Sequence, residues 1–83
     1  MIKLLYFASL RETLGTAAEE LALPGGVDSV TALRGHLAAR GGAWQTLLTA
    51  KSVRCAVNQV TVGAEARLAD GDEVAFFPPV TGG

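Results

Sequence analysis

The chain has little of what catalytic, metal and disulfide sites are usually built from. Its 83 residues contain one cysteine and one histidine, and only 18% of them are charged. The single Cys55 excludes an internal disulfide framework, a four-cysteine iron–sulfur site and a zinc cluster. Because apolar residues flank Cys55 in a strand-like run, we expect a buried small side chain and not a catalytic thiol. We expect His36, outside the apolar stripe of its helix, to be a solvated surface residue and not a general base.

An excess of charge and long apolar runs are also missing. The formal net charge of −1 offers no basic surface for nucleic acid or an anionic membrane. The longest apolar runs hold about seven residues, far fewer than the roughly 20 that span a bilayer. No signal peptide is visible, and no glycine-rich phosphate loop joins a strand to a helix. We therefore predict a cytoplasmic protein that binds neither nucleic acid nor membrane, and that holds no metal or cofactor itself.

Apolar side chains are what the chain does have. Hydrophobic residues make up 49% of it, which is typical of an ordered domain with a dense core. A chain of this length forms one domain and buries roughly 60% of the surface that it exposes when unfolded. An apolar excess in so small a domain predicts that part of it stays exposed for a partner.

The first strand is expected over residues 2–8, where both alternating faces are largely apolar. The inner face is expected to carry Ile2, Leu4 and Tyr6, and the outer face Lys3, Leu5 and Phe7. The capping-box pattern from Ser9 to Glu12 predicts a short helix capped by Ser9. Gly15 suits the residue after the helix, which commonly has a left-handed backbone conformation. Alternating charged and apolar residues predict an edge strand over residues 19–23.

One main helix is expected from about residue 30 to residue 40, capped by Asp28 or Ser29. Its apolar stripe, at the spacing of one helix face, comprises Val30, Leu33 and Leu37. A further helical turn over residues 43–48 is predicted to return Trp44, Leu47 and Leu48 to the core.

Three more strands are predicted, over residues 53–57, 60–62 and 74–77. In the last of them we expect Val74 and Phe76 to face the core and Phe77 to face the opposite side, as Phe7 does on the first strand. Asn58-Gln59 and Asp70-Gly71 have the composition of tight turns before the last two of these strands. The order of strand, short helix, strand, long helix and three strands indicates the α+β class. Its simplest arrangement is a single helix packed across a mixed five-stranded sheet.

The last ten residues combine an apolar strand, two prolines and a glycine-ended tail. Proline lacks an N–H donor and fixes φ, so the strand must end at Pro78 and Pro79 and continue as a stiff stalk. We therefore divide the chain into a domain over residues 1–77 and an extended tail over residues 78–83. Gly82 and Gly83 have no Cβ, so the tail can enter a narrow channel of a partner. This pattern predicts that the main-chain carboxylate of Gly83 is the reactive group.

The same segment resembles a known family. The run Phe76-Phe77-Pro78-Pro79-Val80-Thr81-Gly82-Gly83, preceded by residues 70–75, is similar to the C-terminal signature of the molybdopterin synthase small subunit family. The segments 2–15 and 56–59 are similar to that family as well, so the resemblance spans the chain. It implies a ubiquitin-like β-grasp fold.

The resemblance also implies that this chain is a sulfur carrier with no active site of its own. A partner related to ubiquitin-activating enzymes would adenylate Gly83 with ATP and Mg, and a sulfur donor would convert it to a thiocarboxylate. That group would donate sulfur to cyclic pyranopterin monophosphate in the large subunit of molybdopterin synthase, within an expected heterotetramer, to form the dithiolene. Gly82 would give access to the reaction centre. The residues expected to bind partners are Phe7, Phe77, Pro78, Pro79, Val80 and Thr81.

Three other interpretations stay open at this point. The chain could be a protein modifier whose Gly83 becomes amide-linked to lysines. It could carry sulfur for another pathway, as the thiamine thiazole carriers do, although those chains are typically shorter and lack the Phe-Phe-Pro-Pro-Val-Thr run. It could also be an interaction domain whose terminus is inert.

Overall fold

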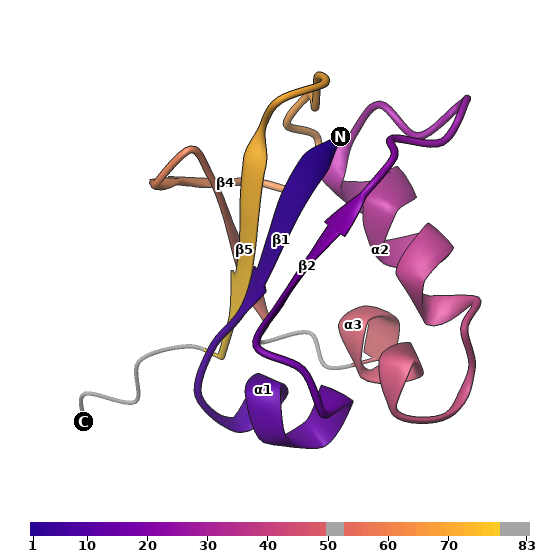
Figure 1. Cartoon of the computed structure of the whole chain (residues 1–83), viewed down its shortest axis with the longest axis vertical. Helices are drawn as coiled ribbons and strands as arrows, with labels where there is room; N and C mark the ends of the chain where they lie inside the picture. The colour runs from indigo at the N-terminus through magenta and orange to yellow at the C-terminus, as the bar shows by residue number, and fades with distance from the viewer. Residues whose placement is uncertain (50–52, 79–83) are drawn as a thin grey trace.

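Figure 1 shows the fold in a computed structural model of the chain, which describes residues 1–49 and 53–78. Five strands form one sheet, and helices or turns connect them. In chain order the elements are β1 (Ile2–Tyr6), α1 (Ser9–Leu14), β2 (Ala18–Leu21), α2 (Val30–Ala38), the 3-10 turn η1 (Gly42–Gln45), α3 (Thr46–Thr49), β3 (Arg54–Val57), β4 (Val60–Val62) and β5 (Glu73–Phe77). No helix in these two ranges is long and apolar enough to cross a membrane.

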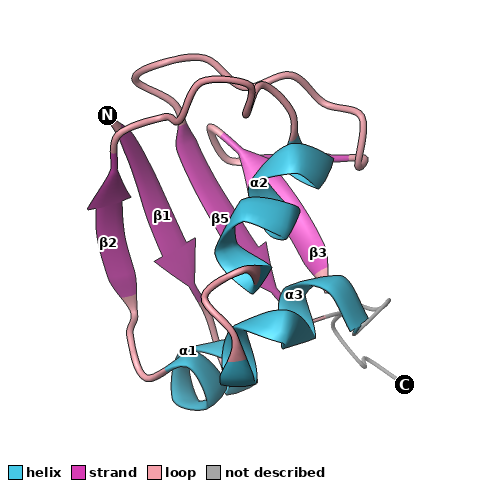
Figure 2. Cartoon of the chain, turned by 90° about the vertical axis from the view of Figure 1, so that its right-hand side faces the viewer, coloured by secondary structure: helices cyan, strands magenta, loops and turns pink. Residues whose placement is uncertain are grey.

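The sheet is mixed, with its first and last strands side by side at the centre. The strand order is β2-β1-β5-β3-β4; β1 and β5 run parallel, and every other neighbouring pair is antiparallel. Helix α2 crosses one face of this sheet, as Figure 2 shows. The predicted α+β arrangement of one main helix across a mixed five-stranded sheet is therefore confirmed.

The core lies between α2 and the inner face of the sheet. The inner residues of β1, the α2 stripe and two residues of β5 are each at most 1% exposed: Ile2, Leu4, Tyr6, Val30, Leu33, Leu37, Val74 and Phe76. These are the residues that the two periodicities predicted, because a strand places alternate residues on one face and a helix every third or fourth. The Oγ of Ser29 accepts a hydrogen bond from the amide of Ala32 at 3.1 Å, so Ser29 is the predicted helix cap.

A polar cluster fastens the end of α2 to the edge of the sheet. The helix ends at Ala38, and Arg40 beyond it donates two hydrogen bonds, of 2.8 and 2.9 Å, to the carboxylate of Glu19 on β2. The hydroxyl of Tyr6 donates to the same carboxylate at 3.1 Å. The Arg40 guanidinium also lies 4.4 Å from the centre of the Trp44 ring. The hydrogen bond from Arg40 holds the pKa of Glu19 below its usual value, so the carboxylate stays ionised in the fold.

Two local predictions are wrong. Ser9 does not cap α1, because the chain turns out of β1 at Ala8, with φ 52°, and Ser9 is already helical. The cap is Ala8, whose carbonyl accepts from the amide of Arg11, with no side-chain bond. Leu48 is 55% exposed, whereas Leu47 is fully buried. Consecutive residues of a helical turn point about 100° apart, so the single turn of α3 buries only one of the two leucines.

The remaining boundaries differ by a few residues from those predicted. Strand β1 ends two residues before residue 8, β2 spans Ala18–Leu21 and not residues 19–23, and the main helix ends two residues before residue 40. The turns are confirmed. Gly15 ends α1 at φ 77°, and Asn58 and Gln59 have φ 51° and 70°, the positive values of a tight hairpin.

Candidate functional site

The candidate site begins where β5 leaves the sheet. The strand ends at Phe77, and Pro78 follows it, as expected for residues without an N–H donor. The amide of Phe7 donates to the carbonyl of Phe76 at 3.1 Å, so the chain after β1 is held against the end of β5. The other predicted site residues, Pro79, Val80, Thr81, Gly82 and Gly83, lie outside the described residues.

The two phenylalanines of β5 lie on opposite faces of the sheet. Phe76 is fully buried and stacks on Tyr6, with ring centres 6.2 Å apart. Phe77 points to the other face and is half-buried, and Phe7 beside it is 47% exposed. The predicted division between a core Phe76 and outward Phe7 and Phe77 is confirmed. The assignment of Phe7, Phe77 and Pro78 to partner binding stays a prediction.

The strand register gathers these residues with others on the outer face of the sheet. One row crosses all five strands and is built mainly from small or apolar residues: Ala18, Leu5, Ala75, Ala56 and Thr61. The next row, at the root of the tail, contains Phe7, Phe77 and Arg54. A third row, on the other side, contains Glu20, Lys3 and Glu73. We call the first two rows together the outer apolar face.

The helices leave the outer apolar face uncovered. In Figure 2, α2 and α3 lie over the opposite side of the sheet, and in Figure 1 α1 lies below its end. Leu5, Ala56 and Ala75 on this face are half-buried. Alanines make a shallow floor, on which another protein surface can approach the backbone closely. Sequence analysis found Phe7 and Phe77 but missed the row of small residues, because their alignment depends on pairings between distant strands. The one signal for it was the apolar second face of the first strand.

The single cysteine and the single histidine of the chain lie in contrasting surroundings. Cys55 is 1% exposed beneath α2, and burial raises the pKa of its thiol to about 11, so it stays protonated at neutral pH. His36 is exposed. No cluster of three or more His, Cys, Asp or Glu side chains suited to a metal ion occurs within residues 1–49 and 53–78. Both sequence-based interpretations, of a buried Cys55 and a solvated His36, are confirmed.

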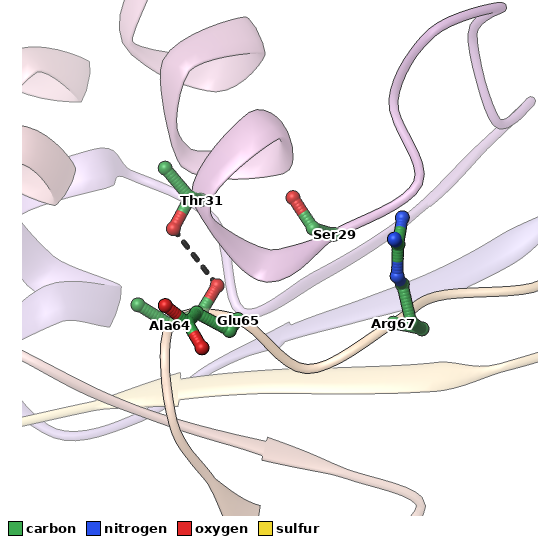
Figure 3. A pocket seen from close by; sticks show the side chains of 5 residues that line it. All are labelled: Ser29, Thr31, Ala64, Glu65 and Arg67. Carbon is green, nitrogen blue, oxygen red and sulfur yellow. Dashed lines mark hydrogen bonds between the residues drawn. The ribbon is translucent and has the colours of Figure 1, made fainter.

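A shallow hollow lies at the start of α2. Its lining residues, drawn in Figure 3, are Ser29, Thr31, Ala64, Glu65 and Arg67. The hydroxyl of Thr31 donates to the carbonyl of Ala64 at 2.8 Å. The first amides of the helix are also paired, those of residues 30 and 31 with backbone carbonyls and that of residue 32 with Ser29. This helix terminus therefore has no free donors for an anion.

The chain matches the ThiS family over residues 4–83. It is 51% identical over 83 residues to the molybdopterin synthase sulfur carrier subunit of Escherichia coli (strain K12), with all of both chains covered. It is 40% identical, again over the whole of both chains, to the protein of the same name from Haemophilus influenzae.

Solved structures share the fold. A Pyrococcus furiosus protein described as molybdopterin converting factor, subunit 1, is 32% identical with a TM-score of 0.76, covering 95% of this chain and 97% of that one. Small archaeal modifier protein 1 from Methanosarcina acetivorans is 28% identical with a TM-score of 0.76, covering 99% and 95%. The complex of subunits 1 and 2 of molybdopterin-converting factor from Helicobacter pylori contains a chain that is 18% identical with a TM-score of 0.66, covering 99% and 97%.

These neighbours confirm the ubiquitin-like β-grasp fold. The chain belongs to the ThiS family, and its relatives at 51% and 40% identity are molybdopterin synthase sulfur carrier subunits.

Proposed function

We propose that this chain is the sulfur-carrier subunit of molybdopterin synthase. The observation that carries the proposal is the 51% identity, over the full length of both chains, to the subunit of that name from E. coli. The geometry supports it, because the last strand leaves the sheet at Pro78 beside an uncovered apolar face. The domain therefore holds the root of the tail and offers a surface for the proteins that act on its end.

The reactive atoms belong to the main chain of Gly83. In the first step its carboxylate oxygen attacks the α-phosphorus of ATP, which a partner binds with Mg, and pyrophosphate leaves. The product is an acyl-adenylate, in which AMP is a good leaving group. The free carboxylate has no such group, because substitution at its carbonyl carbon would have to expel oxide. A sulfide nucleophile then attacks the carbonyl carbon and displaces AMP, which leaves a thiocarboxylate. This group is ionised at neutral pH, and its sulfur is a soft nucleophile.

Transfer would take place in the large subunit, in the expected heterotetramer. There the thiocarboxylate sulfur would attack a carbon of cyclic pyranopterin monophosphate, and water would then hydrolyse the resulting thioester and return the Gly83 carboxylate. Two such transfers would supply the two sulfurs of the dithiolene. Gly82 would let the tail lie in a narrow channel, since it has no side chain to collide with the walls. Phe7, Phe77 and Pro78 would contact the partner at the root of the tail, and Pro79, Val80 and Thr81 along it.

Intact mass after co-expression with an activating enzyme of this type tests the proposal. We expect replacement of one oxygen by sulfur at the C-terminus, and formation of the dithiolene product when the large subunit and its pterin substrate are added. A chain that lacks Gly83 is the matched control and should acquire no sulfur. Dithiolene formation by the control at the rate of the intact chain would refute the mechanism.

A protein modifier is the second candidate, because a fold neighbour at 28% identity is a small archaeal modifier protein. In that case Gly83 would form an amide with lysine side chains and would not end as a free thiocarboxylate. Peptide mass spectrometry of proteins from the producing cells distinguishes the two candidates. Gly-Gly remnants on lysines that vanish when Gly83 is deleted would favour the modifier.

A further inference from the structure

Arg54 lies beside the root of the tail, on the outer apolar face. Its Cα is paired with that of Phe77 in the register of β3 and β5. The next residue, Cys55, is buried in the core, so the Arg54 side chain points to the outer face, where it is exposed. A cation thus stands next to the half-buried aromatic ring from which the tail departs.

The side chains of three of the other four arginines have acceptors within residues 1–49 and 53–78, and the fourth, Arg11 on α1, has none there. Arg34 donates to the carbonyls of residues 47 and 53, Arg40 to Glu19, and Arg67 to Asp28. The Arg54 side chain makes no hydrogen bond or ion pair with any residue in the ranges 1–49 and 53–78. None of its five N–H donors is used within this part of the chain, and their planar fork matches a carboxylate.

Carboxylates gather at the opposite end of the sheet. On the outer face Glu73 and Glu20 flank Lys3. In the turn before β5, Asp70 pairs with the N-terminal ammonium and Asp72 accepts a hydrogen bond from Asn58. Strand β5 runs from this acidic end to the root of the tail, where Arg54 stands. The charge along the outer face therefore differs between its ends, with two carboxylates beside one lysine at the start of β5 and the Arg54 cation at the root of the tail.

Resting on the proposed function, we propose that Arg54 is a specificity-determining residue for docking to the large subunit. The matching surface of that subunit presents an apolar hollow for Phe77 and a carboxylate at its rim that accepts from the Arg54 guanidinium. Burial of Phe77 excludes water from the neighbouring ion pair, so the pair resists screening better than an exposed one. A carboxylate in this position also selects the orientation of docking, because the acidic end of the face would repel it.

Titration of the large subunit with the full-length chain tests the proposal, at low and at high salt. Arg54→Leu keeps the apolar area and removes the charge, whereas Arg54→Glu reverses it. We expect Arg54→Leu to raise Kd about tenfold and to reduce its salt dependence, and Arg54→Glu to raise Kd roughly a hundredfold. Arg67→Glu makes the same charge reversal at the far end of the molecule and should change Kd by about twofold or less.

The outcomes separate this inference from the proposed function. Binding by Arg54→Leu as tight as that of the unchanged chain would overturn the role of Arg54, since a purely apolar contact would then suffice. Equal weakening by Arg54→Glu and Arg67→Glu would also overturn it, because the effect would come from net charge alone. If Phe77→Ala still weakens binding in either case, docking through the outer apolar face stands. Failure of the unchanged chain to bind the large subunit would instead refute the proposed function.

Discussion

Truncation of the two neighbouring phenylalanines of β5 should have opposite consequences. Phe76 is fully buried, stacks on Tyr6, and has the guanidinium of Arg34 5.6 Å from its ring centre. Phe77 is half-buried on the other face and touches none of that core. We therefore predict that Phe76→Ala damages the isolated domain and that Phe77→Ala damages its complexes.

The magnitudes follow from burial. Replacing a fully buried Phe by Ala costs about 3–5 kcal/mol in transfer and cavity energy. A domain of this length has a free energy of unfolding of about 4–12 kcal/mol, so Phe76→Ala can lose most of its stability. Phe76→Leu retains much of the volume and should cost about 1–2 kcal/mol. Phe77→Ala should cost about 1 kcal/mol or less, because the ring is only partly removed from water in the free chain.

Urea unfolding of the three variants measures these costs, and titration with the large subunit measures binding. We expect Phe77→Ala to lose about 2 kcal/mol or more of binding free energy, as truncated aromatic anchors commonly do. Phe76→Leu, which should still fold, should bind within about threefold of the unchanged chain, because the side chain at position 76 lies on the inner face and does not reach the partner. A larger stability loss for Phe77→Ala than for Phe76→Leu would mean that the reasoning from strand facing is wrong.

Three further predictions concern the tail and the polar cluster. Deletion of Gly83 should abolish sulfur transfer while the melting temperature stays the same; retained transfer would exclude Gly83 as the carrier. Gly82→Val should slow activation and transfer more than it changes thermal stability, since a β-branched side chain obstructs a narrow channel; a sharp fall in melting temperature would make Gly82 structural. Because the pKa of Glu19 is lower in the folded than in the unfolded chain, its stabilisation is present above the unfolded value and is lost as pH falls through the folded one. Glu19→Gln should therefore flatten the acid side of the stability profile measured by urea unfolding, and an unchanged profile would show that Arg40 contributes nothing through that carboxylate.

The local sequence determined which residues face inward and where the last strand ends, and it placed the elements to within a few residues. Alternation placed Tyr6 and Phe76 in the core and Phe77 outside it, and the diproline after Phe77 ended the strand. These outcomes depend on the periodicity of side-chain direction along a strand or helix and on the restricted backbone geometry of proline. Both act over only a few neighbouring positions. The β-grasp fold could be assigned only with the family resemblance as well, because the same order of elements is compatible with other α+β folds.

Only the tertiary structure decided which distant residues became neighbours. The pairing of β1 with β5 and of β5 with β3 aligned Leu5, Ala75 and Ala56 in one row and set Arg54 beside Phe77. The bond of Arg40 to Glu19 likewise joins residues that are 21 positions apart. A strand fixes the face of each side chain, but its partner and register follow from the packing of the whole sheet under α2. The proline and glycine pattern of the tail is therefore visible in the sequence, whereas the surface beside its root exists only in the fold.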